Sequence, residues 1–168
     1  MTRPVTDRVK QSLFDILSPH LEDARVYDLF AGTGSMGLEC LSRGAAHVTF
    51  FEADRSAVQR LKKNIAAVGV SDRSEVVAGD LFRWFGATDP AVKAAVVFLD
   101  PPYRFLREQP EAMQRLATQI GNHHLADDGI VVFRHDAHDR LDLPPLAVAD
   151  ERTYGGMTIE FLRRTTVP

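Results

Sequence analysis

Short apolar segments alternate along the chain with longer amphipathic segments. The apolar segments predict β-strands over residues 26–30, 47–52, 75–78, 94–99 and 130–134. Apolar residues at helical spacing predict helices over residues 35–43, 56–68 and 111–120, and Gly44 and Gly69 can end the first two. An earlier helix is predicted to begin after Thr6, whose hydroxyl can cap it, and to end at Ser18 and Pro19.

The predicted strands show little polar alternation. "AAVVFL", at residues 94–99, is typical of a strand buried on both faces of a parallel sheet. The alternation of strands and helices predicts a doubly wound, Rossmann-like α/β fold, with a mostly parallel twisted sheet and helices on both faces. The tail "DERTYGGMTIEFLRR" predicts two strands joined near Gly155 and Gly156, and therefore an antiparallel hairpin at one edge of the sheet.

Composition limits the class of protein. Of the 168 residues, 45% are hydrophobic and 26% charged, so we expect one globular domain over residues 1–168. The single cysteine excludes an internal disulfide framework, and no apolar run reaches the roughly 18 residues that a membrane span requires. The N-terminus lacks the pattern of a signal peptide, so we predict a cytoplasmic protein with no membrane partner. A net charge of −3 argues against a protein that coats nucleic acid through positive charge alone.

A glycine-rich segment follows the strand predicted over residues 26–30. "DLFAGTGSMGLE" contains Gly32, Gly34 and Gly37 in a G-x-G-x-x-G array ahead of a helix. Glycine lets the backbone approach a ligand closely, and the helix N-terminus offers unpaired N–H groups. Glu52 lies 20 residues after Gly32, where a carboxylate can accept hydrogen bonds from ribose hydroxyls. These features predict a nucleoside-containing cofactor and by themselves also allow a dinucleotide.

Two further acids narrow the choice of cofactor. Asp28 precedes the glycine loop, where its carboxylate would attract a ligand's ammonium group and repel a pyrophosphate. Asp80 follows the third strand, where its carboxylate or the neighbouring backbone can reach an adenine edge. A ligand with adenine, ribose and an amino-acid head but no phosphate fits S-adenosylmethionine. The alternatives of a turn acid at Asp28 and a helix cap at Asp80, near Leu81, stay open.

"FLDPPY", at residues 98–103, ends a predicted buried strand with two prolines. In an open α/β sheet, ligands bind beyond the carboxyl ends of the strands, so this segment is expected beside the glycine loop. The prolines stiffen the backbone and aim its carbonyls. The Asp100 carboxylate and the Pro101 carbonyl are two acceptors that can hold the two donors of an exocyclic amine, and the base can stack on Tyr103.

These motifs resemble a known family. D-P-P-Y after a Rossmann-like S-adenosylmethionine site is similar to the amino-methyltransferases of nucleic acids and of glutamine. More narrowly, "RPVTDRVKQSLFDIL", "DLFAGTGSMGLECLSRGA", "FFEAD" and "FLDPPY" are similar, in order and spacing, to the bacterial 16S rRNA (guanine-N2-)-methyltransferase family. The similarity runs from about Arg3 to Arg164, and the N-terminal block is its most specific part.

The resemblance implies methyl transfer from S-adenosylmethionine to the N2 amine of a guanine, in 16S rRNA or the assembling small ribosomal subunit. The implied base-handling residues are Asp100, Pro101, Pro102 and Tyr103. The implied cofactor contacts are Asp28, Phe30, Ala31, Gly32, Gly34, Glu52, Asp80 and Leu81. Residues 1–20 would form an N-terminal helix and a substrate entrance, where Arg3, Arg8 and Lys10, together with Arg104, would meet RNA phosphates. Members of the family usually carry a further basic, glycine-containing stretch ahead of this block.

Other functions stay compatible with parts of the pattern. The same pair of acceptors, the Asp100 carboxylate and the Pro101 carbonyl, also suits the amine of adenine in DNA or a glutamine side chain. The glycine loop with Glu52 also allows a nicotinamide-dependent oxidoreductase. An inert RNA chaperone that retains the cofactor is a further alternative.

A metal site is not expected, because His123, His124, His135 and His138 follow no metal motif and are predicted to be surface polar residues. Cys40 is predicted to be a buried structural thiol, Trp84 and Phe85 to pack in the core, and the protein to be a monomer.

Overall fold

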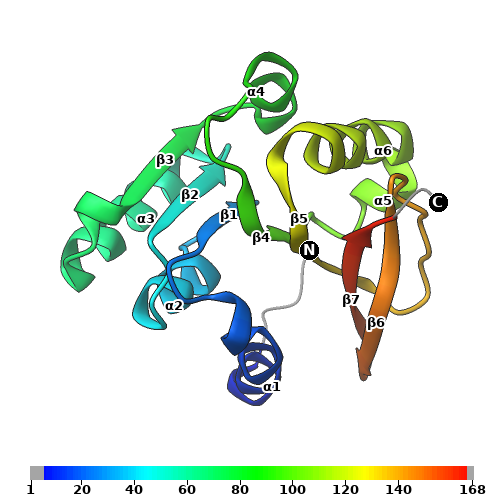
Figure 1. Ribbon diagram of the computed structural model, residues 1–168, viewed down its shortest axis with the longest axis horizontal. Helices are drawn as coiled ribbons and strands as arrows, with labels where there is room; N and C mark the ends of the chain where they lie inside the picture. The colour runs from blue at the N-terminus through cyan, green and yellow to red at the C-terminus, as the bar shows by residue number, and fades with distance from the viewer. Residues whose placement is uncertain (1–5, 166–168) are drawn as a thin grey trace.

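The computed structural model describes residues 6–165, in which seven strands form one sheet of order β3-β2-β1-β4-β5-β7-β6 (Figure 1). The strands are β1 (Arg25–Leu29), β2 (His47–Glu52), β3 (Ser74–Ala78), β4 (Ala94–Leu99), β5 (Leu125–Asp136), β6 (Leu146–Tyr154) and β7 (Met157–Arg164). Strands β1 to β5 pair in parallel, whereas β7 runs antiparallel to both β5 and β6. The predicted parallel sheet and C-terminal hairpin are therefore confirmed.

Helices cover both faces of the sheet. They are α1 (Asp7–Leu17), α2 (Ser35–Ser42), α3 (Arg55–Val68), α4 (Leu81–Ala87), α5 (Phe105–Glu108) and α6 (Pro110–Gln119), with short helical turns η1 (Ser18–His20), η2 (Ser71–Arg73) and η3 (Ile120–His124). The first three helices pack on one face and α4 to α6 on the other, as the lower and upper layers of Figure 1 show. Side chains alternate across each strand, so each layer has its own apolar core.

The N-terminal helix is held in place by capping and packing. The Thr6 hydroxyl accepts a hydrogen bond from the backbone N–H of Val9 at 3.3 Å, which confirms the predicted cap. Leu13, Phe14 and Leu17 are fully buried, and the Phe14 ring lies 6.1 Å from the Phe98 ring of β4. Apolar packing thus anchors α1 beneath the central strands, close to the predicted base-handling segment.

Some elements escape prediction for physical reasons. The four residues of α5 and the seven of α4 are too few to show a helical period. Strand β6 begins at Leu146, four residues before the predicted hairpin segment. It lies at the edge of the sheet with most of its residues at least partly exposed, so it lacks the apolar run that marks the central strands. Strand β5 begins at Leu125, five residues before the predicted start, in a stretch that includes the exposed Asp127 and Asp128.

The prediction that all four histidines are surface residues is wrong for His124 and His135, which are both fully buried. His124 packs edge-on against Phe85, with ring centroids 4.6 Å apart, inside the aromatic cluster of the upper layer. His135 Nε2 lies 2.8 Å from Glu160 Oε2 across β5 and β7. Burial lowers the pKa of His135, but hydrogen bonds to Glu160 and to the Asp136 carbonyl raise it above its ordinary value.

Other structural expectations stand as follows. Cys40 is fully buried, and burial raises the pKa of its thiol, as a structural cysteine requires. Trp84 and Phe85 pack against Phe51 as predicted. Among residues 6–165, no helix has the length and apolar character needed to cross a membrane. In the same range, no group of three or more histidine, cysteine or acidic side chains is arranged to hold a metal ion.

Candidate active site

The glycine loop joins β1 to α2 and needs its glycines for two different reasons. Gly32 and Gly34 have φ angles of 59° and 88°, in the left-handed region that side chains disfavour. A Cβ atom on Gly37 would lie 2.3 Å from the Phe50 ring, so glycine lets α2 pack directly on β2. A Cβ on Gly32 would meet nothing within 4 Å, which leaves room beside the loop for a ligand.

Two of the predicted cofactor acids brace this loop. Glu52 accepts hydrogen bonds from the N–H groups of Gly32 at 2.7 Å and Asp54 at 2.9 Å. Asp28 accepts a hydrogen bond from the N–H of Gly37 at 3.0 Å. The fold therefore brings Asp28 and Glu52 to the same short segment, although they are far apart in the sequence.

Asp28 has an unusual electrostatic environment, because its side chain is buried and its one bonded neighbour is a backbone amide. Burial raises the pKa of Asp28 to about 8, the Gly37 hydrogen bond opposes this rise, and the charges of Asp100 and Glu52 add to it. The acid is therefore mostly neutral at pH 7. A cation bound next to it would favour the ionised form, which fits the predicted contact with an ammonium group.

Aromatic rings from the glycine loop, α4 and α5 meet beyond the carboxyl ends of the strands. Phe30 has a φ of 60°, and its ring lies edge-on to Phe105 at 5.6 Å and to Phe82 at 6.5 Å. The neighbouring Ala31 donates its N–H to the Phe51 carbonyl at 2.9 Å, which ties the loop to β2. Sequence analysis included Phe30 and Ala31 but missed Phe82 and Phe105, although both closely follow predicted site residues.

Asp80 and Leu81 begin helix α4. The Asp80 carboxylate caps the helix by accepting hydrogen bonds from the N–H groups of Phe82 at 2.9 Å and Arg83 at 3.4 Å. Leu81 is buried in the upper core, so only its backbone could face a ligand. The capping alternative for Asp80 is thus observed, and a contact with a cofactor is left as a proposal.

The D-P-P-Y segment lies next to the glycine loop because β4 pairs with β1. Leu99 is in register with Leu29, so Asp100 and Phe30 leave the sheet side by side. Pro101 is buried, whereas Pro102 and Tyr103 are half-buried. The Pro102 carbonyl accepts a hydrogen bond from the Phe105 N–H at 2.9 Å, which forms the turn into α5. The expected position of this segment is therefore confirmed.

Arg134 of β5 is a site residue that sequence analysis missed. Its Nε donates to Asp100 Oδ1 at 2.8 Å and its Nη2 to Asp100 Oδ2 at 2.7 Å. Burial raises the pKa of Asp100, and the hydrogen bonds and charge of Arg134 oppose that rise. The only sequence signal was a charged residue inside the apolar run of β5, "IVVFRHD".

The predicted RNA-binding residues occupy different environments. Arg3 lies outside the described residues, and Arg8 is exposed on α1. Lys10 Nζ donates to Ser35 Oγ at 3.0 Å and lies 3.5 Å from Glu39, so it is held at the start of α2 beside the glycine loop. The Arg104 guanidinium lies 5.4 Å from the Phe105 ring centroid, and its side chain is 62% exposed.

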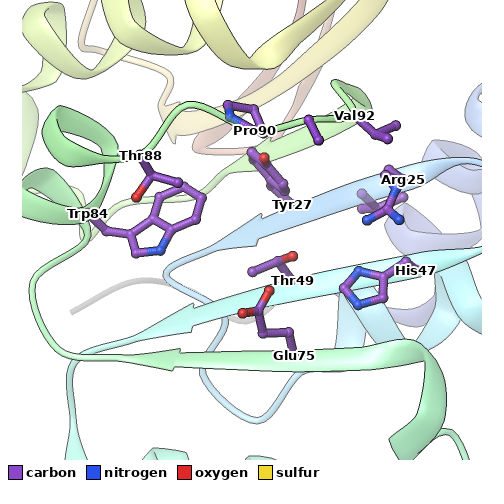
Figure 2. Close-up of a pocket in the computed structure, with 11 residues that line it drawn as sticks. Arg25, Tyr27, His47, Thr49, Glu75, Trp84, Thr88, Pro90 and Val92 are labelled. Atoms are coloured by element: carbon purple, nitrogen blue, oxygen red, sulfur yellow. The ribbon is translucent and has the colours of Figure 1, made fainter.

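A separate hollow lies on the upper face of the sheet, away from these residues (Figure 2). Arg25, His47 and Glu75 line it from the beginnings of β1, β2 and β3, and Trp84 lines it from α4. It therefore lies toward the amino ends of the strands, whereas the predicted site is at their carboxyl ends. Ligands of open α/β sheets bind at the carboxyl ends, so this hollow is not the candidate site.

Comparison with known proteins identifies the family of this chain. The family model described as conserved hypothetical protein 95 matches residues 1–163. The chain belongs to this family. The ribosomal RNA small subunit methyltransferase D of Escherichia coli (strain K12) is 34% identical over 145 residues, which cover 85% of this chain and 69% of that protein.

Solved structures agree with this membership. The methyltransferase yhhF from Escherichia coli matches with a TM-score of 0.81 and 30% identity, over 97% of this chain and 88% of that chain. An RNA methyltransferase from Salinibacter ruber, in complex with S-adenosyl-L-homocysteine, shares the fold with a TM-score of 0.72 and 23% identity, over 99% of this chain and 97% of that chain. The fold is that of class I methyltransferases, and the predicted enzyme class and family resemblance are confirmed.

Proposed function

We propose that the protein transfers a methyl group from S-adenosylmethionine to the exocyclic N2 amine of a guanine in 16S rRNA. The observation that carries this proposal is the pairing of β1 with β4, with Leu29 opposite Leu99. This pairing brings two features to one edge of the sheet. One is a glycine loop suited to a cofactor without phosphate, and the other is the pair of acceptors, Asp100 and the Pro101 carbonyl, that can hold an amine. The small-subunit rRNA methyltransferase among the relatives supports ribosomal RNA as the substrate class.

The residues of the loop fit S-adenosylmethionine, which supplies an electrophilic methyl group on a sulfonium. Asp28 would pair with the ammonium of the amino-acid head, and Glu52 has lone pairs left over for ribose hydroxyls after binding two backbone amides. The open space beside Gly32 would admit the nucleoside against the backbone. The S-adenosyl-L-homocysteine complex of the Salinibacter ruber protein supports this choice of cofactor.

The clamp residues would activate the guanine amine by orienting it. Asp100 would accept one N–H of the amine and the Pro101 carbonyl the other, so the nitrogen lone pair would be turned away from the ring and toward the methyl group. As the new bond from nitrogen to the methyl carbon forms, the bond from that carbon to sulfur would break and S-adenosyl-L-homocysteine would leave. Positive charge would develop on the nitrogen, where the Asp100 carboxylate would stabilise it. One amine proton is then released to water, which returns the nitrogen to its neutral form. Tyr103 would support the base by stacking, worth about 1–3 kcal/mol.

We expect the RNA to enter past α1, where Arg8 is exposed, and past Arg104 at the start of α5. Lys10 is already bonded at the glycine loop, so we assign it a smaller share of phosphate binding than Arg8. We also propose that residues 1–168 act as one domain and that the protein is a monomer. The RNA-binding assignments rest on exposure and charge, and a salt dependence of RNA binding would accompany them.

The proposal is tested with purified protein, labelled S-adenosylmethionine, and small subunits and naked 16S rRNA from cells that lack the enzyme. We expect label in N2-methylguanosine after nuclease digestion, and loss of label with Asp100→Asn but not with Asp72→Asn, an exposed control. Label in unmethylated duplex DNA or in a glutamine-containing peptide, with none in either RNA, would replace the proposed substrate. Binding of NADH in place of S-adenosylmethionine would overturn the enzyme class.

A further inference from the structure

A row of polar side chains crosses the carboxyl edge of the sheet on its lower face, which α1 and α2 cover. Side chains two residues apart share a face of a strand, so Asp28 follows Val26, Asp100 follows Phe98, and Arg134 follows Val132 on the lower face. Strand order places these three side chains on the neighbouring elements β1, β4 and β5. Arg134 is the only cation that this row contains among the described residues.

We propose that Arg134 is a positioning residue that holds the Asp100 carboxylate in the orientation that receives the target amine. The proposal rests on the proposed function, because Asp100 has this task only in an amine methyltransferase. Through Arg134, strand β5 would affect catalysis, although it contributes no residue to the D-P-P-Y motif itself.

The geometry of the pair is that of a rigid clamp. Two different nitrogens of one planar guanidinium bind the two oxygens of Asp100, at 2.8 Å and 2.7 Å. Such a bidentate pair fixes the plane of the carboxylate as well as its distance, which a lysine cannot do. Each carboxylate oxygen has a second lone pair, so an amine can still donate to Asp100 while Arg134 holds it.

Arg134 lies in a buried and well-packed part of the sheet. Its side chain is only 8% exposed, compared with 23% for Asp100. Strand β5 is paired on both sides, with β4 and β7, and Nη1 of Arg134 lies 3.5 Å from the Met157 sulfur at the start of β7. The C-terminal hairpin therefore contributes to the site by holding the arginine that holds the acid.

The pair also favours the ionised form of Asp100, whose pKa burial nevertheless holds above its ordinary value. Among the described residues, the charged or titratable groups near Asp100 are Arg134 from β5 and the acid Asp28 from β1. The small hollow that Asp100 and Arg134 line is otherwise apolar, with Leu13, Met36, Phe98, Val132 and Ile159 around it. Burial raises the pKa of Asp100, and Arg134 is the group that lowers it. Without the arginine, Asp100 would take up a proton more readily, and the protonated acid is a poorer acceptor for an amine.

The test compares Arg134→Gln and Arg134→Lys with the wild type in three measurements. Calorimetric affinity for S-adenosylmethionine is expected to change less than about threefold, because Arg134 contacts Asp100 and not the glycine loop. The kcat for RNA methylation is expected to fall about 100-fold in Arg134→Gln and less in Arg134→Lys, with the acidic limb of its pH profile moved to higher pH. Carboxyl NMR titration, assigned with Asp100→Asn, is expected to show a higher pKa for Asp100 in Arg134→Gln.

Arg164→Gln is the matched control, because Arg164 is also a partly buried strand arginine and donates to the Gly121 carbonyl at 2.7 Å, far along β7 from Met157. We expect it to keep wild-type kcat and pH profile. Wild-type kcat and pH profile in Arg134→Gln would overturn the proposal. An unchanged Asp100 titration would overturn it independently of any substrate. Absence of RNA methylation by the wild type would instead overturn the proposed function, and the titration would still decide whether Arg134 controls Asp100.

Discussion

Two acids lie at the carboxyl edge of neighbouring strands, but the protein treats them differently. Asp28 of β1 is buried with a backbone amide as its bonded partner, and its pKa is raised to about 8. Asp100, after β4, faces a guanidinium that binds both of its oxygens. The cofactor half of the site is thus built from backbone and a nearly neutral acid, whereas the substrate half is built on an ion pair. The same residue type near the ends of neighbouring strands can serve two tasks because its partners differ.

The largest expected effect comes from removing the charge in the substrate half. Asp100→Asn removes the carboxylate that stabilises the developing positive charge, so we expect kcat to fall about 100- to 1,000-fold. Affinity for S-adenosylmethionine should change little, because the proposed cofactor contacts lie at the ends of β1, β2 and β3 and not in the D-P-P-Y segment. Single-turnover methylation and calorimetry measure the two halves separately. A loss of cofactor affinity as large as the loss of rate would mean that the two halves are not separate.

The cofactor half depends instead on close backbone packing. Gly37→Ala would place a methyl group 2.3 Å from Phe50 and 2.9 Å from Val48, so α2 must shift away from β2. Overpacking of this kind costs about 1–3 kcal/mol of unfolding free energy. Thermal or denaturant unfolding measures the change, and Gly86→Ala, at a helical glycine with open space around it, is the control. Equal stability of the two variants would contradict the tight packing.

The pH dependence of cofactor binding distinguishes the two acids directly. The free protein holds a proton on Asp28 below about pH 8, and pairing with an ammonium requires the ionised form, so binding releases that proton. Affinity for S-adenosylmethionine should therefore rise between pH 6.5 and 7.5, by at most about tenfold. Calorimetry in buffers of different ionisation enthalpy measures both the affinity and the proton released.

Asp28→Asn is the control for this measurement. The amide cannot ionise, so binding should be weaker and should lose its dependence on pH in this range. A flat wild-type affinity over the same range would show that Asp28 is already ionised in the free protein.

The smallest expected effect concerns the support behind Arg134. Met157→Leu keeps the size of the side chain but removes the sulfur that lies 3.5 Å from Nη1. Sulfur is a weak acceptor, so we expect kcat to fall less than about threefold, with no change in stability beyond about 1 kcal/mol. Steady-state kinetics checks this, and a loss as large as that of Arg134→Gln would mean that Met157 has a task of its own.

The local sequence pattern was sufficient to predict much of the fold and of the candidate site. The central strands show as apolar runs because both of their faces are buried, and the glycine loop and D-P-P-Y show because their backbone conformations need particular residues. The beginning of the edge strand β6 and the short helix α5 could not be predicted, since exposure and short length remove the periodic signal. His135 looked like a surface residue because its partner, Glu160, comes from a strand 25 residues later.

What the sequence determined by itself is therefore the class of fold, the order of its elements, and the two motifs that meet at its edge. Only the tertiary structure decided which charges meet there. Asp100 and Arg134 are 34 residues apart, and their contact exists because β4 and β5 are neighbours in the sheet. Local sequence controls backbone conformation, whereas the pKa of an acid depends on the burial and charges that the whole chain assembles around it.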